Sequence, residues 1–214
     1  MVSVVKLETK KIISIVIVAA IAVGIGAFLI NTSYIGGSDT AGNFQIEKGD
    51  YMHFDITGVS VAFGVLDGTM RWEIVEETGE EVTVQTKYTG GIANMLGKNE
   101  NSFYEGTNKS ENIYIVKEVS PKENLWSGGD GDSVINIRKT RENGTLVSKE
   151  TIKTELGEIL VSHYERNDNL SKVDVYYEEN VKIPIKVSAD IGNMASMTLV
   201  LNDTNIEEIL DKFE

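Results

Sequence analysis

Residues 181–201 read VKIPIKVSADIGNMASMTLVL, two stretches in which apolar and polar side chains alternate on either side of Gly192-Asn193. A period of two predicts β-strands that bury one face and leave the other in water, which is typical of an antiparallel sheet. Pro184 has no backbone N–H, so we expect its strand to lie at a sheet edge or to carry a bulge. The apolar residues of the two stretches are Val181, Ile183, Ile185, Val187, Met197, Leu199 and Leu201.

The same alternation extends back along the chain to Tyr51. It predicts strands at residues 51–57, 59–65, 69–77, 81–89, 113–119, 134–140, 144–153 and 172–178, whereas residues 155–164 are ambiguous and favour a strand only towards their end. Asp67-Gly68 and Asn143-Gly144 are hairpin signals between such strands, and no helical pattern separates them as a parallel sheet would require. The sequence therefore predicts an all-β, mainly antiparallel domain over residues 44–214, built as a curved sheet, a half-barrel or a sandwich.

The end of the chain predicts a short C-terminal helix. Apolar residues are spaced i, i+3, i+4 and i+7, and Thr204 and Glu207 fit a capping box at the start of the helix. The apolar residues are Ile206, Ile209, Leu210 and Phe213.

Residues 12–30, IISIVIVAAIAVGIGAFLI, contain no charge and one serine. A helix of this length rises about 28 Å, close to the thickness of a bilayer's hydrocarbon core, which predicts a transmembrane helix. Three lysines precede the run: Lys6, Lys10 and Lys11. Residues 1–11 are therefore expected in the cytoplasm and residues 31–214 outside the cell membrane. The polar, glycine-containing residues 31–43 then form a linker.

Two alternatives exist for this apolar run. A cleaved signal peptide would end its apolar region at a small-x-small site, but Ala20-Ile21-Ala22 lies in the middle of the run. A core helix that is apolar on every side would need more protein around it than the remaining chain provides. Membrane attachment through residues 12–30 is therefore the favoured interpretation.

Composition limits the function. The net charge of −13 repels nucleic acid, so no nucleic-acid partner is expected. The absence of cysteine excludes disulfides, a thiol nucleophile and a lipid-modified cysteine. No nucleophile elbow, phosphate-binding loop or H-E-x-x-H motif occurs, so we predict that the protein is not an enzyme.

Aromatic residues at strand positions are the candidate ligand-binding set. Such side chains line apolar binding surfaces, although they also occur as core residues or cross-strand pairs. The set consists of Tyr51, Trp72, Tyr88, Tyr176 and Tyr177.

Two candidate metal sites follow from acidic residues and histidines. Asp130 and Asp132 lie in a glycine-rich loop and would bind Ca²⁺ through carboxylate oxygens, although the full EF-hand pattern is absent and a mobile acidic loop is the alternative. No other cofactor is expected. His163 and Glu165 share a strand face and would form half of a metal site with His53, unless they are simply surface residues.

Five N-x-S/T sequons would accept glycans if the domain lies outside the cell, and the alternative is polar turns that match by chance. They are Asn31, Asn108, Asn143, Asn169 and Asn202.

Residues 69–88, TMRWEIVEETGEEVTVQTKY, and 173–206, VDVYYEENVKIPIKVSADIGNMASMTLVLNDTNI, resemble parts of archaeal surface proteins with one N-terminal membrane helix and a β-rich outer domain. More distantly, they resemble the curved half-barrel of the LolA/LppX lipoprotein-carrier class. That resemblance implies a concave sheet that holds an apolar ligand. The chain departs from the bacterial members by lacking the lipobox cysteine and clear helices that fill the cup.

The functional hypothesis is a single-pass, membrane-anchored extracytoplasmic protein that binds rather than catalyses. Its ligand would be an apolar molecule such as a lipid, or its partner an envelope protein. The alternative is a structural cell-envelope protein, associated with a surface layer or accessory to a pilus.

Overall fold

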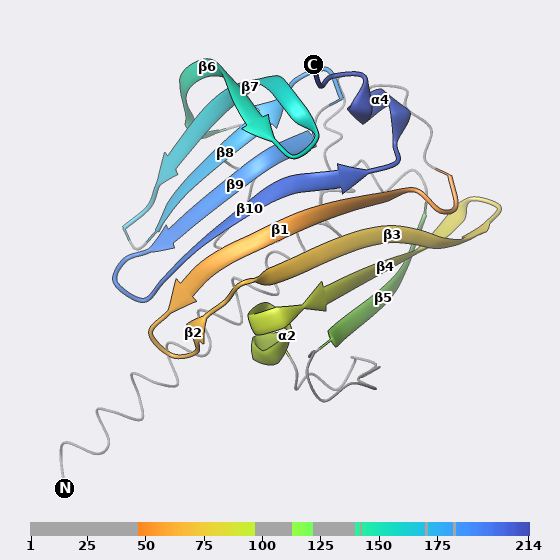
Figure 1. Cartoon of the computed structure of the whole chain (residues 1–214), viewed down its shortest axis with the longest axis horizontal. Helices are drawn as coiled ribbons and strands as arrows, with labels where there is room; N and C mark the ends of the chain where they lie inside the picture. Colours follow the sequence, from red (N-terminus) through yellow and green to blue (C-terminus); the bar gives the residue numbers. More distant parts are fainter. Residues whose placement is uncertain (1–46, 97–112, 122–139, 142, 170, 182) are drawn as a thin grey trace, which may run out of the picture.

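The computed structural model describes residues 47–96, 113–121, 140–141, 143–169, 171–181 and 183–214. These residues form an open, curved, antiparallel sheet with few helices (Figure 1), so the predicted β class is confirmed. The strands are β1 (Tyr51–Ser60), β2 (Gly64–Val65), β3 (Gly68–Thr78), β4 (Glu81–Thr89), β5 (Ile113–Pro121), β6 (Thr145–Thr154), β7 (Gly157–Asn167), β8 (Lys172–Glu178), β9 (Ile183–Ile191) and β10 (Ala195–Thr204). The helices are α2 (Gly90–Leu96) and α4 (Glu207–Leu210).

The predicted membrane helix at 12–30 and the linker at 31–43 lie outside the described residues. Within the described ranges, no helix combines the length and apolar character that crossing a membrane demands. The membrane anchor therefore stays a prediction.

The sheet joins two hairpin series through the pairing of its first and last strands. Its order is β5-β4-β3-β1-β10-β9-β8-β7-β6, with β2 added beside β1. At the centre, Phe54 of β1 lies opposite Leu201 of β10, and Ile56 lies opposite Leu199. This pairing brings together residues nearly 150 positions apart, and a sheet with such non-local contacts is expected to fold slowly.

One face of the sheet, which we call the inner face, carries the hydrophobic core. Its side chains alternate with those of the opposite, outer face, as the period of two predicts. The inner-face core includes Met52, Phe54, Ile56, Met70, Trp72, Ile74, Val82, Val84, Tyr88, Val173, Val175, Ile185, Val187, Leu199 and Leu201.

Helix α2 was not predicted, because Gly90-Gly91 indicates only a turn after β4. Gly90 has φ +71°, a conformation that glycine adopts readily, and the N–H of Gly91 donates to the carbonyl of Asp67 at 2.6 Å. The chain then turns back as a helix whose Ile92 and Ala93 are buried. Helix α2 packs against β3, β4 and β5.

The place of β9 in the sheet decides whether Pro184 lies at a sheet edge or at a bulge. It lies between β8 and β10, so the edge alternative is wrong. The register of β8 against β9 shifts between Tyr176 and Tyr177, where Tyr177 meets Pro184, so the bulge alternative is confirmed. The bulge accommodates a residue that has no N–H to donate.

The predicted hairpin turn at Asn143-Gly144 is wrong. Thr140, Arg141 and Asn143 have helical backbone, and the N–H of Gly144 donates to the carbonyl of Thr140 at 2.8 Å, so Asn143-Gly144 forms no hairpin turn. Residues 134–139 of the predicted partner strand lie outside the described residues.

The capping box is also absent. Helix α4 begins after Ile206, which makes no side-chain cap. The hydroxyl of Thr204 instead accepts from the N–H of Ile206 at 3.3 Å and donates to the carbonyl of Tyr51 at 2.6 Å. Thr204 thus ties the end of β10 to the start of β1, a contact that sequence spacing cannot reveal.

The sheet predicts a large difference between two identical substitutions. Leu201 on β10 is fully buried, whereas Leu160 on β7 is 62 % exposed. We expect Leu201→Ala to lower the free energy of unfolding by about 2–5 kcal/mol, because it opens a cavity in the core. Leu160→Ala should change it by less than about 0.5 kcal/mol. Urea unfolding of the full-length variants in mild detergent measures both, and equal effects would contradict this assignment of the inner face.

Candidate functional site: the inner face of β3 and β4

Three buried polar groups lie together on the inner face. Trp72 of β3 is directly opposite Thr86 of β4, and Tyr88 follows two residues later on the same face. Their exposed fractions are 2 %, 0 % and 1 %. In the described part of the chain, Trp72 Nε1, Thr86 Oγ1 and Tyr88 OH have no hydrogen-bond partner. We call these three residues the polar trio.

An unpartnered buried polar atom is costly. Each such group loses its hydrogen bonds to water, at about 1–3 kcal/mol. Most buried polar groups in folded proteins have a partner, so three exceptions on neighbouring positions of two strands need an explanation. A bound molecule that accepts hydrogen bonds would provide one.

The surroundings of the polar trio are apolar. Ile74 and Val84 flank it along the strands, and Ile92 of α2 belongs to the same core. The ring of Tyr114 on β5 lies 6.1 Å from that of Tyr88 between centroids, tilted by 54°. On β3 and β4, the inner face from Met70 to Ile74 and from Val82 to Tyr88 carries no charged side chain.

The trio supplies hydrogen-bond donors. The indole of Trp72 can only donate, and the hydroxyls of Thr86 and Tyr88 can donate or accept. Burial raises the pKa of the Tyr88 phenol well above its ordinary value, so it keeps its proton at any physiological pH. The site therefore suits a neutral acceptor held in apolar surroundings.

The predicted aromatic set is divided between the two faces. Trp72 and Tyr88 lie together in the polar trio, and Tyr177 is on the inner face of β8, in the other half of the sheet. The guanidinium of Arg141 lies 4.8 Å from the centre of the Tyr177 ring and 3.2 Å from Glu179. Tyr177 is therefore part of a separate, charge-paired cluster.

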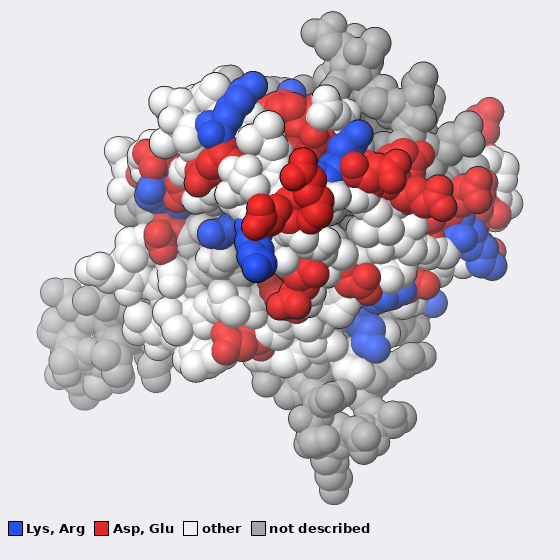
Figure 2. All heavy atoms as spheres, turned by 45° about the horizontal axis from the view of Figure 1, so that its top comes forward, with Lys and Arg blue, Asp and Glu red and all other residues white. Residues whose placement is uncertain are grey.

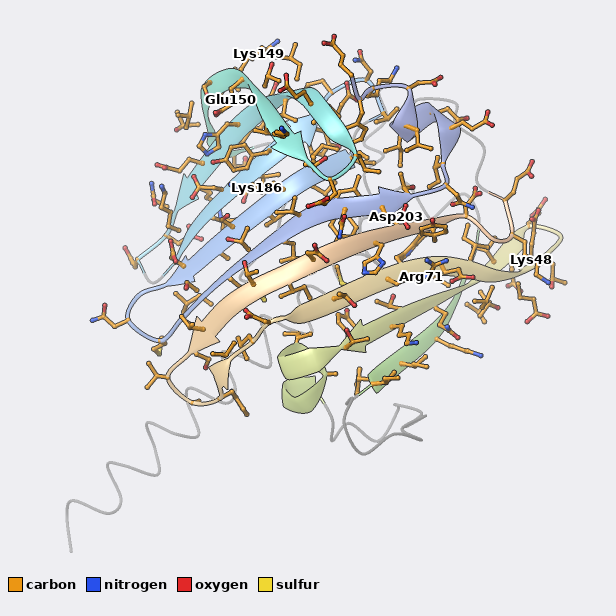
Figure 3. All side chains as sticks on the ribbon, viewed as in Figure 1. Lys48, Arg71, Lys149, Glu150, Lys186 and Asp203 are labelled. Carbon is orange, nitrogen blue, oxygen red and sulfur yellow. The ribbon has the colours of Figure 1, made fainter. Side chains whose placement is uncertain are left out.

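Tyr51 and Tyr176 belong to the outer face. The guanidinium of Arg71 lies 3.6 Å from the centre of the Tyr51 ring, and the Tyr51 hydroxyl donates to Asp203 at 2.9 Å (Figure 3). That hydrogen bond raises the pKa of Tyr51. Tyr176 stacks on His163, with ring centroids 4.3 Å apart. The structure thus does not bring the five aromatic residues into one site.

The outer face carries paired charges, and Figure 2 shows acidic and basic side chains interspersed over one side of the molecule. His163 Nε2 lies 2.8 Å from Asp174 Oδ1, and Lys172 Nζ lies 2.6 Å from Glu165. The hydrogen bond from Lys172 lowers the pKa of Glu165, with a smaller contribution from Asn167. These groups satisfy one another, which is the ordinary arrangement of a solvated face.

The histidines do not form the predicted half-site for a metal. His53 is on β1 and His163 on β7, with β10, β9 and β8 between them. A search of the described residues finds no group of three His, Asp or Glu side chains arranged to hold a metal ion. Asp130 and Asp132 lie outside those residues, so the calcium site stays a prediction.

The sequons are placed as follows. Asn143 and Asn169 are exposed. Asn202 is half-buried on β10, and its Nδ2, the atom that would carry a glycan, donates to Asp55 at 2.7 Å. Asn31 and Asn108 lie outside the described residues.

Sequence reasoning missed Thr86, although a signal existed. In β4 the residues Glu81, Thr83, Gln85 and Lys87 point outward, so Thr86 had to fall in the inward phase with Val82, Val84 and Tyr88. A polar side chain in the apolar phase of a strand is the feature that identifies it.

Comparison with known proteins adds little. No family model and no curated protein sequence matches the chain. Among solved structures, it is similar to a candidate lipoprotein from Parabacteroides distasonis, with 12 % identity and a TM-score of 0.36 over 78 % of this chain and 100 % of that one. A candidate exported protein with a YmcC-like fold from Bacteroides fragilis covers the same shares, with 10 % identity and a TM-score of 0.38.

A LolA superfamily protein from Nitrosomonas europaea matches 86 % of this chain and 96 % of its own, with 10 % identity and a TM-score of 0.26. None of these three structures supports the resemblance to archaeal surface proteins.

Replacing threonine by valine should change the free energy of unfolding in opposite directions at Thr86 and at Thr198. Thr86→Val should raise the free energy of unfolding of ligand-free protein by about 1 kcal/mol, because it removes a buried hydroxyl without a partner. Thr198→Val is the matched control, since the hydroxyl of Thr198 shares a hydrogen bond with Ser188 at 3.0 Å. That variant should be less stable by about 0.5–1.5 kcal/mol. Thermal or urea unfolding measures both, and a loss at Thr86 would indicate a partner inside the protein.

The ion pair of Lys172 and Glu165 on the outer face predicts that the stability of the fold depends on pH. Because the pKa of Glu165 is lowered in the folded protein, its contribution to stability is present above about pH 4.3 and disappears as the pH falls through the folded value. Lys172→Gln should therefore lower stability at pH 7 and have a smaller effect once Glu165 is protonated, the remainder coming from Asp174, whose Oδ2 lies 3.4 Å from Lys172 Nζ. Unfolding measured between pH 7 and pH 3 tests this, with the exposed Lys149→Gln as the control. A Lys172→Gln effect that is independent of pH would contradict it.

Proposed function

We propose that the protein is a non-catalytic, extracytoplasmic binding protein, anchored by residues 12–30, that holds an apolar ligand on the inner face of its curved sheet. The observation that supports this most is the polar trio: three buried groups that have no hydrogen-bond partner among the described residues, on neighbouring positions of an apolar face. A strand face that buries Val84 and Tyr88 on either side of Thr86 has no structural need for a threonine whose hydroxyl lacks a partner in the described part of the chain.

The inner face of β3 and β4 is uncharged, which favours a neutral ligand over an ionised one. An ionised carboxylate or phosphate buried here would lack a compensating cation, because the inner face of β3 and β4 has none. A neutral acceptor, such as the ester carbonyl of an acyl lipid, avoids that cost and accepts from Trp72, Thr86 or Tyr88. The acyl chain would contribute about 0.8 kcal/mol per buried methylene against the surrounding apolar side chains.

The location follows from the sequence. Three lysines precede the apolar run at residues 12–30, and the acidic remainder of the chain would be repelled by anionic lipid head groups. The binding domain would therefore be tethered to the outer side of the membrane by the linker at 31–43, within reach of lipids or lipid-modified proteins of the envelope.

A structural role in the cell envelope is the second candidate, and β6 favours it. This strand is at the edge of the sheet, and most of its side chains are exposed, including those of Leu146 and Val147. Among the described strands, none pairs with its outer backbone edge, which can pair with a strand from a partner. Such pairing needs no ligand on the inner face.

Photo-crosslinking separates the two candidates. The full-length protein is reconstituted in phosphatidylcholine vesicles that contain a lipid with a diazirine on one acyl chain, and the labelled peptides are identified by mass spectrometry. We expect labelling of β3 and β4 around the polar trio, in addition to the membrane segment. Tyr88→Phe combined with Thr86→Val should reduce the β3 and β4 labelling severalfold, because the donors to the ester are lost.

The control is Thr198→Val, which alters a hydroxyl on the opposite face and should leave the labelling unchanged. Labelling confined to residues 12–30 in the wild-type protein would overturn the binding function, since the inner face would then be a closed core. Crosslinks between β6 and an envelope protein on intact cells, without lipid on β3 or β4, would support the structural role instead.

A further inference from the structure

The segment between β1 and β3 forms an apolar tip at one end of the sheet, around the β2 label in Figure 1. The tip consists of residues 58–66, GVSVAFGVL. Its backbone is ordered by pairing: Val59 lies opposite Val65, and the N–H of Val61 donates to the carbonyl of Met194 in the β9–β10 turn at 2.9 Å. The tip is thus a fixed part of the fold.

Leu66 of the tip is buried, but four other apolar side chains of the tip do not join the core. The alternation of Val59, Val61, Phe63 and Val65 predicts a strand with one buried face, but their exposed fractions are 55 %, 79 %, 41 % and 62 %. Exposed apolar side chains gathered in one place indicate a binding surface more often than chance. Elsewhere the same alternation buries its apolar members, as in β3 and β4.

Charge is absent from the tip. No Asp, Glu, Lys or Arg occurs from residue 56 to 66, in a chain whose net charge is −13. A surface hollow of about 420 Å³ lies beside it, lined by Val59, Ser60 and Val61 and by the β9–β10 turn. Of the described residues that line this hollow, only Asp190 is charged. An anionic lipid head group would therefore be disfavoured here, and a zwitterionic one would not.

We propose that the apolar tip docks into the surface of a bilayer of zwitterionic lipids, and that this is the membrane that holds residues 12–30. The docking rests on the anchoring proposed above, but not on a ligand at the inner face. Uncharged loops with exposed valine and phenylalanine gain free energy when these side chains leave water for the interfacial region. Docking would hold one end of the sheet at the lipid.

The length of the chain allows this orientation. Strand β1 has ten residues and separates its first residue, Tyr51, from the tip by about 33 Å. Residues 31–50 can span up to about 66–72 Å when extended. The chain can therefore leave the membrane, run the length of β1 and still place the tip at the lipid surface.

A second copy of the chain is a less suitable occupant. A stable protein–protein interface buries roughly 800 Å² on each partner. The four exposed side chains of the tip and its hollow are small by comparison, whereas a bilayer accepts a few apolar side chains without a matching shape.

The test uses the full chain, which contains no cysteine, so a single introduced cysteine is labelled specifically. Val61→Cys carries an environment-sensitive fluorophore at the most exposed position of the tip, and Glu80→Cys carries it in the exposed turn between β3 and β4. Both proteins are reconstituted in phosphatidylcholine vesicles that contain nitroxide-labelled lipid. We expect blue-shifted emission and at least twofold quenching at Val61, with water-like emission at Glu80.

The possible results are distinct. Water-like emission at both positions in vesicle-bound protein overturns the docking and leaves the anchor intact. Protein that does not remain with the vesicles overturns the anchoring, and the docking with it. A blue shift at Val61 that grows with protein density at constant lipid indicates a second copy and also overturns the proposal. Loss of the Val61 quenching in a Val59→Asp, Val65→Asp background, with unchanged circular dichroism, would support it.

Discussion

The pairing of β1 with β10 is the interaction on which the rest of the structure depends. It joins two series of hairpins that would otherwise be separate small sheets, and it aligns their apolar faces across Phe54–Leu201 and Ile56–Leu199. Because the side-chain period is two, a slip of one residue would turn the apolar side chains of one half into water. This register creates a continuous inner face from β4 to β8, and with it the surroundings of the polar trio.

Two regions depart from the division into an apolar inner face and a polar outer face. The polar trio places unpaired donors inside the apolar face, and the apolar tip places valines and a phenylalanine in water. Each departure costs stability in the isolated protein, and such conflicts are typical of functional sites. Both would be relieved by the proposed lipid, since an acyl lipid offers neutral carbonyls to the trio and an apolar phase to the tip.

Much of the fold was predictable because alternation is a local signal. The strands β3, β4, β8 and β10 agree closely with the predicted ranges. The errors arose where tertiary contacts overrode the pattern: the Gly90 conformation starts α2, Gly144 donates to the carbonyl of Thr140 instead of forming a hairpin turn, and Thr204 bonds to β1. The site was harder to predict, because alternation assigns a residue to a face but does not reveal which strands are neighbours. Tyr177, which is also on the inner face, could not be separated from Trp72 and Tyr88 without the strand order.

The central claim is that the polar trio donates to a neutral acceptor on a bound lipid. Nuclear magnetic resonance of the ¹⁵N-labelled, delipidated full chain tests it most directly through the indole N–H of Trp72, which is assigned by comparison with Trp126→Phe. The account predicts that this resonance moves downfield when a diacyl phosphatidylcholine is added, and much less with the dialkyl ether analogue, because the ether lacks the carbonyl. An indole resonance that stays unchanged with both lipids would contradict it.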